Sequence, residues 1–216
     1  MSSPLEVTDA PRQLGRPRDP RLDAAITDAT LRLLADCGYT ALTMEAVAAS
    51  AGVGKATLYR RFPGKEQLVI EAVATLGEPP ERVSGAGVRD ELVALLEAIR
   101  RKSDSSLAGK IFPRLLSAGA DNPELMRRYR EQVLDPRRAR FVAVLQRGVQ
   151  EGLLRADVEL AYAVDLLVGP MVYRNLIRKD PRPGPELAAR IVDDVLVALG
   201  PRTTRTHPRA DMTEQP

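Results

Sequence analysis

The pattern of apolar and polar positions along this chain is helical almost throughout. From residue 20 to residue 37, apolar side chains recur three or four positions apart, which places them on one face of an α-helix. Glycine and proline gather near residues 77–87 and break the pattern there. The helical spacing then returns in later segments, at 88–102, 106–118, 123–152 and 185–199. The pattern therefore predicts an all-α protein in two parts, joined near residues 77–87.

The segment after the first helix carries the most informative pattern. Thr43 precedes a short helix with one apolar face, and its hydroxyl can accept a hydrogen bond from a free backbone N–H at the helix start. The run Ala51-Gly52-Val53-Gly54 ends this helix, because Gly52 can adopt the left-handed conformation of a helix end. A second short helix, from about Lys55 to Arg61, turns Leu58 inward. The segment therefore consists of two short helices at a glycine turn.

The outward face of the second short helix is basic. Lys55, Arg60 and Arg61 lie on it beside Thr57 and Tyr59, and no acidic residue falls within this helix. This arrangement is typical of a helix-turn-helix whose second helix enters the DNA major groove. Because isolated helices shorter than about 12–15 residues are marginal in water, we expect both to form one unit with the helix over residues 20–37.

A fourth helix starts at Pro63-Gly64-Lys65-Glu66 and ends before Gly77. Lys65 lies in its first turn, where the helix dipole favours an acid over a cation. A bound phosphate would account for this lysine, because the helix N-terminus also offers free N–H groups to the phosphate. The alternative is a solvated surface lysine.

The chain ends have no helical pattern. Residues 1–19 are expected to form a flexible basic arm, in which Arg16 and Arg18 flank a proline that keeps the backbone extended. Such an arm fits a narrow minor groove, and the alternative is an ordinary solvated basic tail. Residues 201–216 are expected to be disordered.

The last two helices are unusually apolar. Residues 157–177 are apolar nearly all round, and residues 185–199 carry a long apolar stripe. A helix that is apolar on all sides must be covered on all sides. A second copy of the same pair would provide that cover as a four-helix interface about a two-fold axis; the alternative is burial within one subunit. Gly169-Pro170 interrupts the first of these helices, and the bend either shapes a cavity or accommodates packing.

The helix over residues 123–152 is predicted to bend near Pro136. It also carries an arginine cluster that resembles a nucleic-acid patch. Glu131 and Asp135 interleave with these arginines, which indicates an ion-paired or solvated face rather than a DNA contact. The cluster consists of Arg127, Arg128, Arg130, Arg137, Arg138 and Arg140.

Composition excludes several classes of protein. The 216 residues carry a net charge of +3, one cysteine (Cys37) and one histidine (His207, in the polar tail). These counts exclude an internal disulfide and leave no pattern for a metal site, a cofactor or histidine-based catalysis. The longest apolar run, residues 161–173, is shorter than the roughly 20 residues that span a bilayer, and no signal peptide is visible. We therefore expect a cytoplasmic protein that is not an enzyme and has no membrane partner.

The stretch GVGKATLYRRFPGKEQL resembles the signature of TetR/AcrR-type transcriptional regulators, and the resemblance covers roughly Pro20 to Leu76. The stretch DLLVGPMVYRNLI is more loosely similar to C-terminal domains of that family. The resemblance implies a helix-turn-helix DNA-binding domain at 20–77 and a helical domain at 85–200 that binds an effector and dimerises.

The resemblance also implies a function. We expect a ligand-responsive regulator, commonly a repressor in this family, that binds a palindromic operator in double-stranded DNA as a homodimer formed through about 157–178 and 185–199. An unknown small-molecule effector would release it. A helical adaptor that does not bind DNA is the alternative, which the basic helix argues against.

The family pattern also assigns the DNA contacts residue by residue. The family often has an aromatic residue or histidine where this chain has Arg60-Arg61, so its base preference is not carried over. Thr43, Tyr59 and Lys65 would hold phosphates, while the base edges would face Gly54, Lys55, Ala56, Thr57, Arg60 and Arg61.

Overall fold

The computed structural model describes residues 20–76, 86–104, 106–178, 184 and 186–201, and every regular element within them is helical. The all-α prediction is confirmed. The N-terminal part contains four helices: α1 (Pro20–Ala41), α2 (Met44–Ser50), α3 (Lys55–Arg61) and α4 (Lys65–Thr75). The start predicted for α2 and the limits predicted for α3 agree with the structure.

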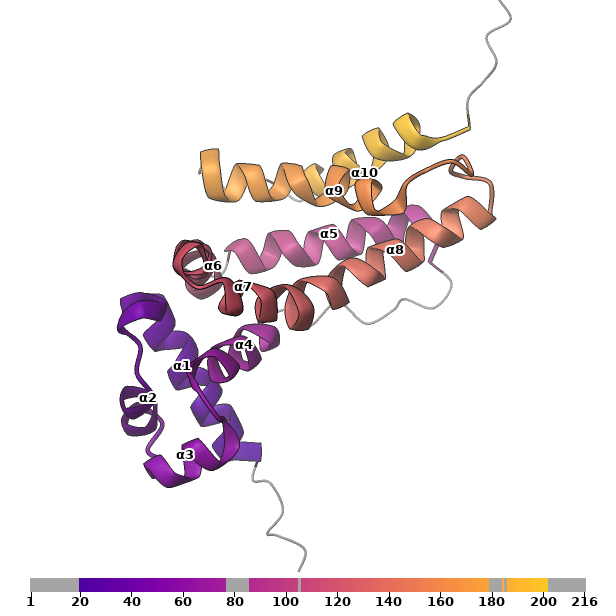
Figure 1. The fold of residues 1–216 in the computed structure, drawn as a ribbon. Helices are drawn as coiled ribbons and strands as arrows, with labels where there is room; N and C mark the ends of the chain where they lie inside the picture. Colours follow the sequence, from indigo (N-terminus) through magenta and orange to yellow (C-terminus); the bar gives the residue numbers. More distant parts are fainter. Residues whose placement is uncertain (1–19, 77–85, 105, 179–183, 185, 202–216) are drawn as a thin grey trace, which may run out of the picture.

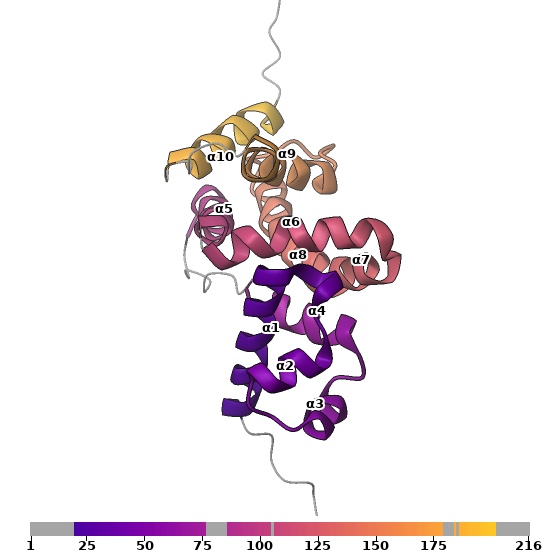
Figure 2. The same cartoon turned by 90° about the vertical axis from the view of Figure 1, so that its left-hand side faces the viewer.

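The C-terminal part is a layered helical bundle. Figure 1 shows α9 and α10 at the end of the molecule opposite α2 and α3. Figure 2 shows α6 and α7 lying across the N-terminal part, between it and the rest of the bundle. The elements are α5 (Val88–Asp104), α6 (Ser106–Asp121), α7 (Pro123–Tyr129), the π-helix η1 (Arg130–Leu134), α8 (Asp135–Gln150), α9 (Leu160–Val172), the π-helix η2 (Tyr173–Arg178) and α10 (Glu186–Leu199).

Helix α1 changes direction at Gly38, where its end was predicted. The φ angle of Gly38 is 77°, a left-handed conformation that side chains other than hydrogen disfavour. Helical structure resumes at once, and the Leu42 N–H donates to the Gly38 carbonyl over 3.2 Å. The glycine therefore produces a kink, after which Tyr39 and Leu42 turn into the core.

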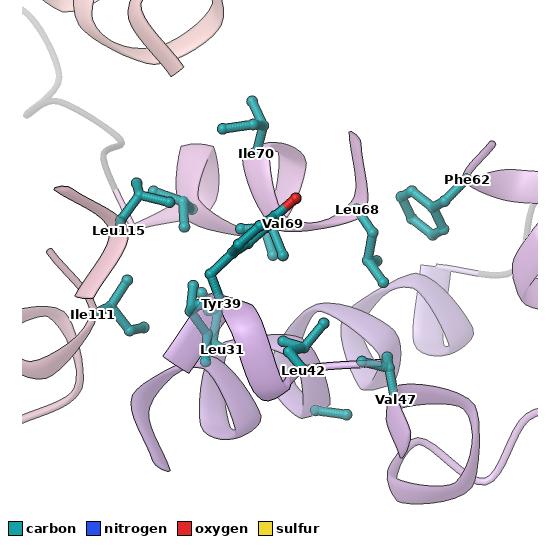
Figure 3. Packing of buried hydrophobic residues seen from close by; sticks show 14 of the residues in the cluster. Leu31, Tyr39, Leu42, Val47, Phe62, Leu68, Val69, Ile70, Ile111 and Leu115 are labelled. Carbon is teal, nitrogen blue, oxygen red and sulfur yellow. The ribbon is translucent and has the colours of Figure 1, made fainter. Parts of the chain in front are cut away.

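The core that supports the N-terminal part does not stop at the break in the sequence. In Figure 3, Ile111 and Leu115 of α6 lie beside Leu31, Tyr39 and Val69 of α1 and α4. Three further members of this first core, Leu125, Tyr129 and Val133, come from α7 and η1. A second core joins α5, α8, α9 and α10. The predicted two-part sequence thus folds so that α6, α7 and η1 complete the core of the N-terminal helices.

Hydrogen bonds cross the same junction. The Tyr39 hydroxyl donates to Glu66 Oε1 of α4 over 2.7 Å and accepts from Asn122 Nδ2, just before α7, over 3.4 Å. The Arg114 guanidinium of α6 donates to the Ala35 carbonyl, in the last regular turn of α1 before the kink. Asn122 also caps α7, because its Oδ1 accepts from the Leu125 N–H over 3.0 Å. Polar contacts therefore fix α6 and α7 to α1 and α4.

Each of the two π-helices lies near a proline in the sequence. The bend expected near Pro136 takes the form of π-helical turns over Arg130–Leu134, directly before this proline. Proline lacks an N–H and its ring clashes with the carbonyl four residues earlier, so a regular α-helix cannot run through it undisturbed. A second π-helix, Tyr173–Arg178, follows α9, which contains Pro170; it lies after its proline, and the ring clash does not explain it.

Helix α10 buries its apolar stripe within the chain. Its apolar stripe contacts α5 and α9 in the second core, and only Val197 among its large apolar residues stands outward, 85% exposed. The members of that stripe are Ala188, Ile191, Val192, Val195 and Leu199.

Helix α9 differs because it has a second apolar face. It buries Val164 and Leu167 but leaves Tyr162 outward, 56% exposed, and Tyr173 and Ile177 of the following η2 are also outward, 53% and 69% exposed. With η2 it forms a 19-residue helix, Leu160–Arg178, longer than the apolar run predicted and sufficient by length and composition to cross a membrane. Only 22% of the most apolar 18-residue stretch of this helix is buried. The outward face therefore has no cover among the described residues.

Three of the six arginines in the cluster on α7, η1 and α8 form ion pairs: Arg127, Arg128 and Arg138. Arg127 lies 2.7 Å from both Glu124 and Glu131, and Arg138 lies 2.5 Å from Asp165 of α9. Glu124 and Glu131 fix the Arg127 guanidinium at the surface of α7, and Asp165 ties Arg138 to α9. The paired arginines therefore make contacts within the bundle.

Candidate nucleic-acid interface

The start of α2 is capped as its sequence predicted. The Thr43 hydroxyl accepts a hydrogen bond from the Ala46 N–H over 3.1 Å, and Thr43 itself is in an extended conformation. Thr43 is exposed, and its hydroxyl hydrogen is not used by this bond. The residue therefore presents a donor at the tip of the N-terminal part, beside the free N–H groups of the first turn of α2.

The turn between α2 and α3 depends on Gly52. Its φ of 66° is left-handed, and its N–H donates to the Ala49 carbonyl while the Val53 N–H donates to the Ala48 carbonyl. These two bonds form a Schellman motif, which closes a helix end and returns the chain toward the core. Val53 packs against the first core as a result. The turn thereby sets the angle at which α3 leaves α2.

Helix α3 is anchored by one face and open on the other. Leu58 is fully buried, and Phe62 directly after the helix is also in the first core. Gly54 is the N-cap and provides no side-chain bond, so the first N–H groups of α3 have no side-chain acceptor. On the open face, Thr57 is partly buried, while Gly54, Lys55, Ala56, Tyr59 and Arg60 are exposed.

Tyr59 is held by a carboxylate from the neighbouring helix. Its hydroxyl donates to Glu45 Oε1 of α2 over 3.1 Å, and the ring remains 47% exposed. The pKa of Glu45 is lowered, first by its own backbone N–H and then by the Tyr59 hydroxyl. Glu45 therefore stays ionised and positions the tyrosine against α2.

Arg61 is also paired. Its guanidinium forms an ion pair with Asp23 in the first turn of α1, and its side chain is 19% exposed. By contrast, Arg60 is exposed and points outward from α3. The two adjacent arginines, predicted as equivalent, thus differ: Arg61 ties α3 to α1, and Arg60 is available to a ligand.

Lys65 has an internal role that its sequence position did not indicate. Its ammonium donates to the Tyr39 carbonyl over 3.1 Å, approaches the Thr40 carbonyl at 3.5 Å, and lies 4.3 Å from the centre of the Tyr39 ring. A cation at the end of a helix stabilises its free carbonyl groups. The lysine in the first turn of α4 therefore closes the last turn of α1, which explains why a cation is tolerated there.

The basic face predicted as free of acids is not free of them in the structure. Glu45 and Asp23 reach it from α2 and α1 and neutralise part of its charge. Glu45 and Asp23 lie outside α3, so the sequence of this helix alone does not reveal them. The predicted minor-groove residues Arg16 and Arg18 lie outside the described residues.

Comparison with known proteins decides the family. Residues 26–72 match the family described as bacterial regulatory proteins, tetR family, and residues 85–195 match the tetracyclin repressor-like C-terminal domain. This chain belongs to the TetR family of transcriptional regulators. It is 34% identical, over 197 residues, to an uncharacterised HTH-type transcriptional regulator of Mycobacterium tuberculosis, covering 88% of this chain and 95% of that protein.

Other TetR-family proteins agree with this assignment. The DNA-binding transcriptional repressor TetR of Mycobacteroides abscessus is 30% identical over 183 residues, which cover 82% of this chain and 92% of the repressor. The TetR family transcription regulator SCO0332 superposes with a TM-score of 0.63 at 30% identity, covering 84% of this chain and all of that one. A TetR regulator from Agrobacterium tumefaciens has the same fold, with a TM-score of 0.68 at 23% identity over 85% of this chain and 96% of that one.

Membership of the TetR family makes the exposed face of α3 and the tip of α2 part of a DNA-binding domain. The chain is a DNA-binding transcriptional regulator, and the helical adaptor that does not bind DNA is not supported. The family is one of regulators rather than enzymes.

Proposed function

We propose that this TetR-family chain is a cytoplasmic repressor that binds a palindromic operator as a homodimer and is released by a small-molecule effector. The observation that carries the proposal is the α3 face: a helix anchored by Leu58 presents Lys55 and Arg60 to solvent directly after an uncapped N-terminus. Groups of this kind bind guanine edges and phosphates in a major groove.

The structure supports a refined set of DNA contacts. Base edges face Gly54, Lys55, Ala56, Thr57 and Arg60, and among the two arginines we assign base reading to Arg60 because Arg61 is paired with Asp23. Thr43 and Tyr59 hold phosphates, with Glu45 fixing the orientation of the Tyr59 ring. Lys65 adds positive charge at the start of α4, but two backbone carbonyls already occupy its ammonium.

A second copy covers the outward face of α9 and η2. Tyr162, Val172, Tyr173 and Ile177 make this face apolar, and Val197 of α10 extends it. Monomeric proteins seldom expose contiguous apolar patches of this kind. An isologous pair would place two α3 helices on one side of the DNA, about one helical turn or a multiple apart, and so require an approximately palindromic operator.

Effector release follows from the shared core. An effector bound among the C-terminal helices would favour one arrangement of α6, α7 and η1, and these elements contact α1 and α4. The population of DNA-competent dimers would shift by no more than the difference between the effector's affinities for the two states.

Selection of bound sequences from a random duplex pool by the purified chain, at low and moderate salt, tests the proposal. Recovery of one short palindrome that survives moderate salt is expected. Binding without a shared sequence, or no binding, would reject sequence-specific recognition. Sedimentation of the chain and of the Ile177→Asp variant tests the dimer: wild type should sediment as a dimer and the variant as a monomer.

A further inference from the structure

Arg137, a partly buried arginine in the C-terminal part, has one buried nitrogen without a hydrogen-bond partner. Four arginine nitrogens are buried without a hydrogen bond: those of Arg61, Arg137, Arg147 and Arg155. Three of them lie against carboxylates: Arg61 against Asp23, Arg147 Nη2 at 2.9 Å from Glu91, and Arg155 Nε at 3.0 Å from Asp157. Arg137 Nη2 has no such carboxylate among the described residues.

Arg137 lies where the two cores meet. Val133 precedes it by four residues and Phe141 follows it by four, so the three share one face of the η1–α8 helix. Val133 belongs to the first core and Phe141 to the second, and both are buried. Arg137 therefore lies between residues of the two cores, shortly after the π-helical turns of η1. Turns of this kind occur frequently at functional sites.

Tyr129, 1% exposed, is close enough to Arg137 for their charges to interact. Burial raises the pKa of Tyr129 to about 12 and lowers the pKa of Arg137. Arg137 is partly exposed, but its Nη2 is buried without a partner, and an unpaired buried polar group is costly. Arg137 therefore places a cation near the Tyr129 phenol and between the apolar residues Val133 and Phe141.

We infer that Arg137 is the anchor for an anionic effector, an organic carboxylate with an apolar tail. A carboxylate matches the planar donor pair of a guanidinium, and the tail matches the apolar residues on either side of Arg137. Tyr129 supplies a second donor. The inference rests on the proposed function, because it specifies the chemical class of the effector. The position of Arg137 also explains how effector binding reaches the DNA-binding domain, since Arg137 shares a helix face with Val133, which lies in the first core.

The test uses the full-length chain and a series of carboxylates from butyrate to decanoate, with 1-octanol and inorganic phosphate as comparison ligands. At saturation, at least one carboxylate should raise the Tm of wild type by about 5 °C or more, whereas 1-octanol and phosphate should not. In Arg137→Met the carboxylate shift should vanish. The matched control Arg140→Met changes an exposed arginine of the same helix and should keep the full shift.

A second measurement needs no ligand. Because Arg137→Met removes a partly buried charge and its unpaired buried nitrogen while keeping most of the side-chain volume, the unliganded variant should melt about 2 °C or more above wild type. An unliganded Tm below wild type, a carboxylate shift retained in Arg137→Met, an equal shift with 1-octanol or phosphate, or no shift with any carboxylate would overturn the inference.

Operator binding separates this inference from the proposed function. If a carboxylate stabilises the chain through Arg137 but leaves operator affinity unchanged, the anion site stands and effector-controlled release is wrong. If the chain binds no operator at all, the proposed function fails while the Tm measurements still decide the role of Arg137.

Discussion

Truncating Leu115 tests whether the DNA-binding helices depend on the C-terminal part for their core. Leu115 lies on α6, outside the N-terminal part of the chain, yet it is fully buried against α1 and α4. A buried Leu→Ala change costs about 2–5 kcal/mol, with the larger values where neighbours cannot collapse into the cavity. Here the Arg114 bond to the Ala35 carbonyl fixes α6 on α1. We therefore expect a loss of about 3 kcal/mol, or about 6–12 °C in Tm for a chain of this size.

Hydrogen exchange shows where that loss is felt. In Leu115→Ala, amides of α1 and α4 should exchange faster, and operator affinity should fall although no DNA contact has changed. The matched control is Leu96→Ala, which removes an equally buried leucine of α5 from the second core. It should accelerate exchange in α5, α8 and α10 and spare α1 and α4. Equal protection of α1 and α4 in the two variants would refute a shared core.

Three further changes test individual contacts. Asp23→Asn should lower the free energy of unfolding by less than about 1 kcal/mol, because the Asp23–Arg61 ion pair is partly exposed. Since the change releases Arg61, non-specific DNA affinity should rise and its salt dependence should become steeper. Unchanged salt dependence would show that Arg61 does not reach DNA. Gly52→Ala should lower stability by about 1 kcal/mol or more through its positive φ alone, because open space surrounds the position, and a Tm equal to wild type would argue against the left-handed turn. Glu66→Gln should make the stability of the chain less sensitive to acid. The pKa of Glu66 is held below 4.5, chiefly by the hydrogen bond from the Tyr39 hydroxyl. The ionised carboxylate therefore stabilises the fold fully above pH 4.5, and this stabilisation is lost as the pH falls through the lowered pKa. Wild type and Glu66→Gln should therefore converge in stability at low pH, and a constant difference would contradict the Tyr39–Glu66 bond.

Local features of the fold could be predicted from the sequence. The limits of α3 followed from Leu58 and the preceding glycines, and the cap of α2 from Thr43; Gly38 predicted an end of α1 where the structure has a kink. Each of these depends on a residue's own conformational preference or on partners within one turn of helix. Such information is contained in a short window of sequence.

Contacts between helices could not be predicted in this way. Asp23 precedes Arg61 by 38 positions, and Lys65 reaches the carbonyl of Tyr39 across 26, so no periodicity relates either pair. The same limit applies to α10: its apolar stripe is visible in the sequence, but the α5 surface against which the stripe packs is not. The sequence also does not show that Arg137 lacks an ion-pair partner among the described residues, because the adjacent Arg138 of the same helix does pair, with Asp165.

The most direct test of the central claim, that α3 reads the operator through Arg60, is a pair of affinities measured at fixed salt. Affinity for the selected palindrome and for a scrambled duplex is determined for wild type, Arg60→Ala and the control Arg140→Ala. We expect Arg60→Ala to lower the ratio of specific to non-specific affinity by about 1–3 kcal/mol, with relaxed preference at one base pair of each half-site, and Arg140→Ala to leave the ratio unchanged. An unchanged ratio in Arg60→Ala, or an equal loss in Arg140→Ala, would contradict this claim.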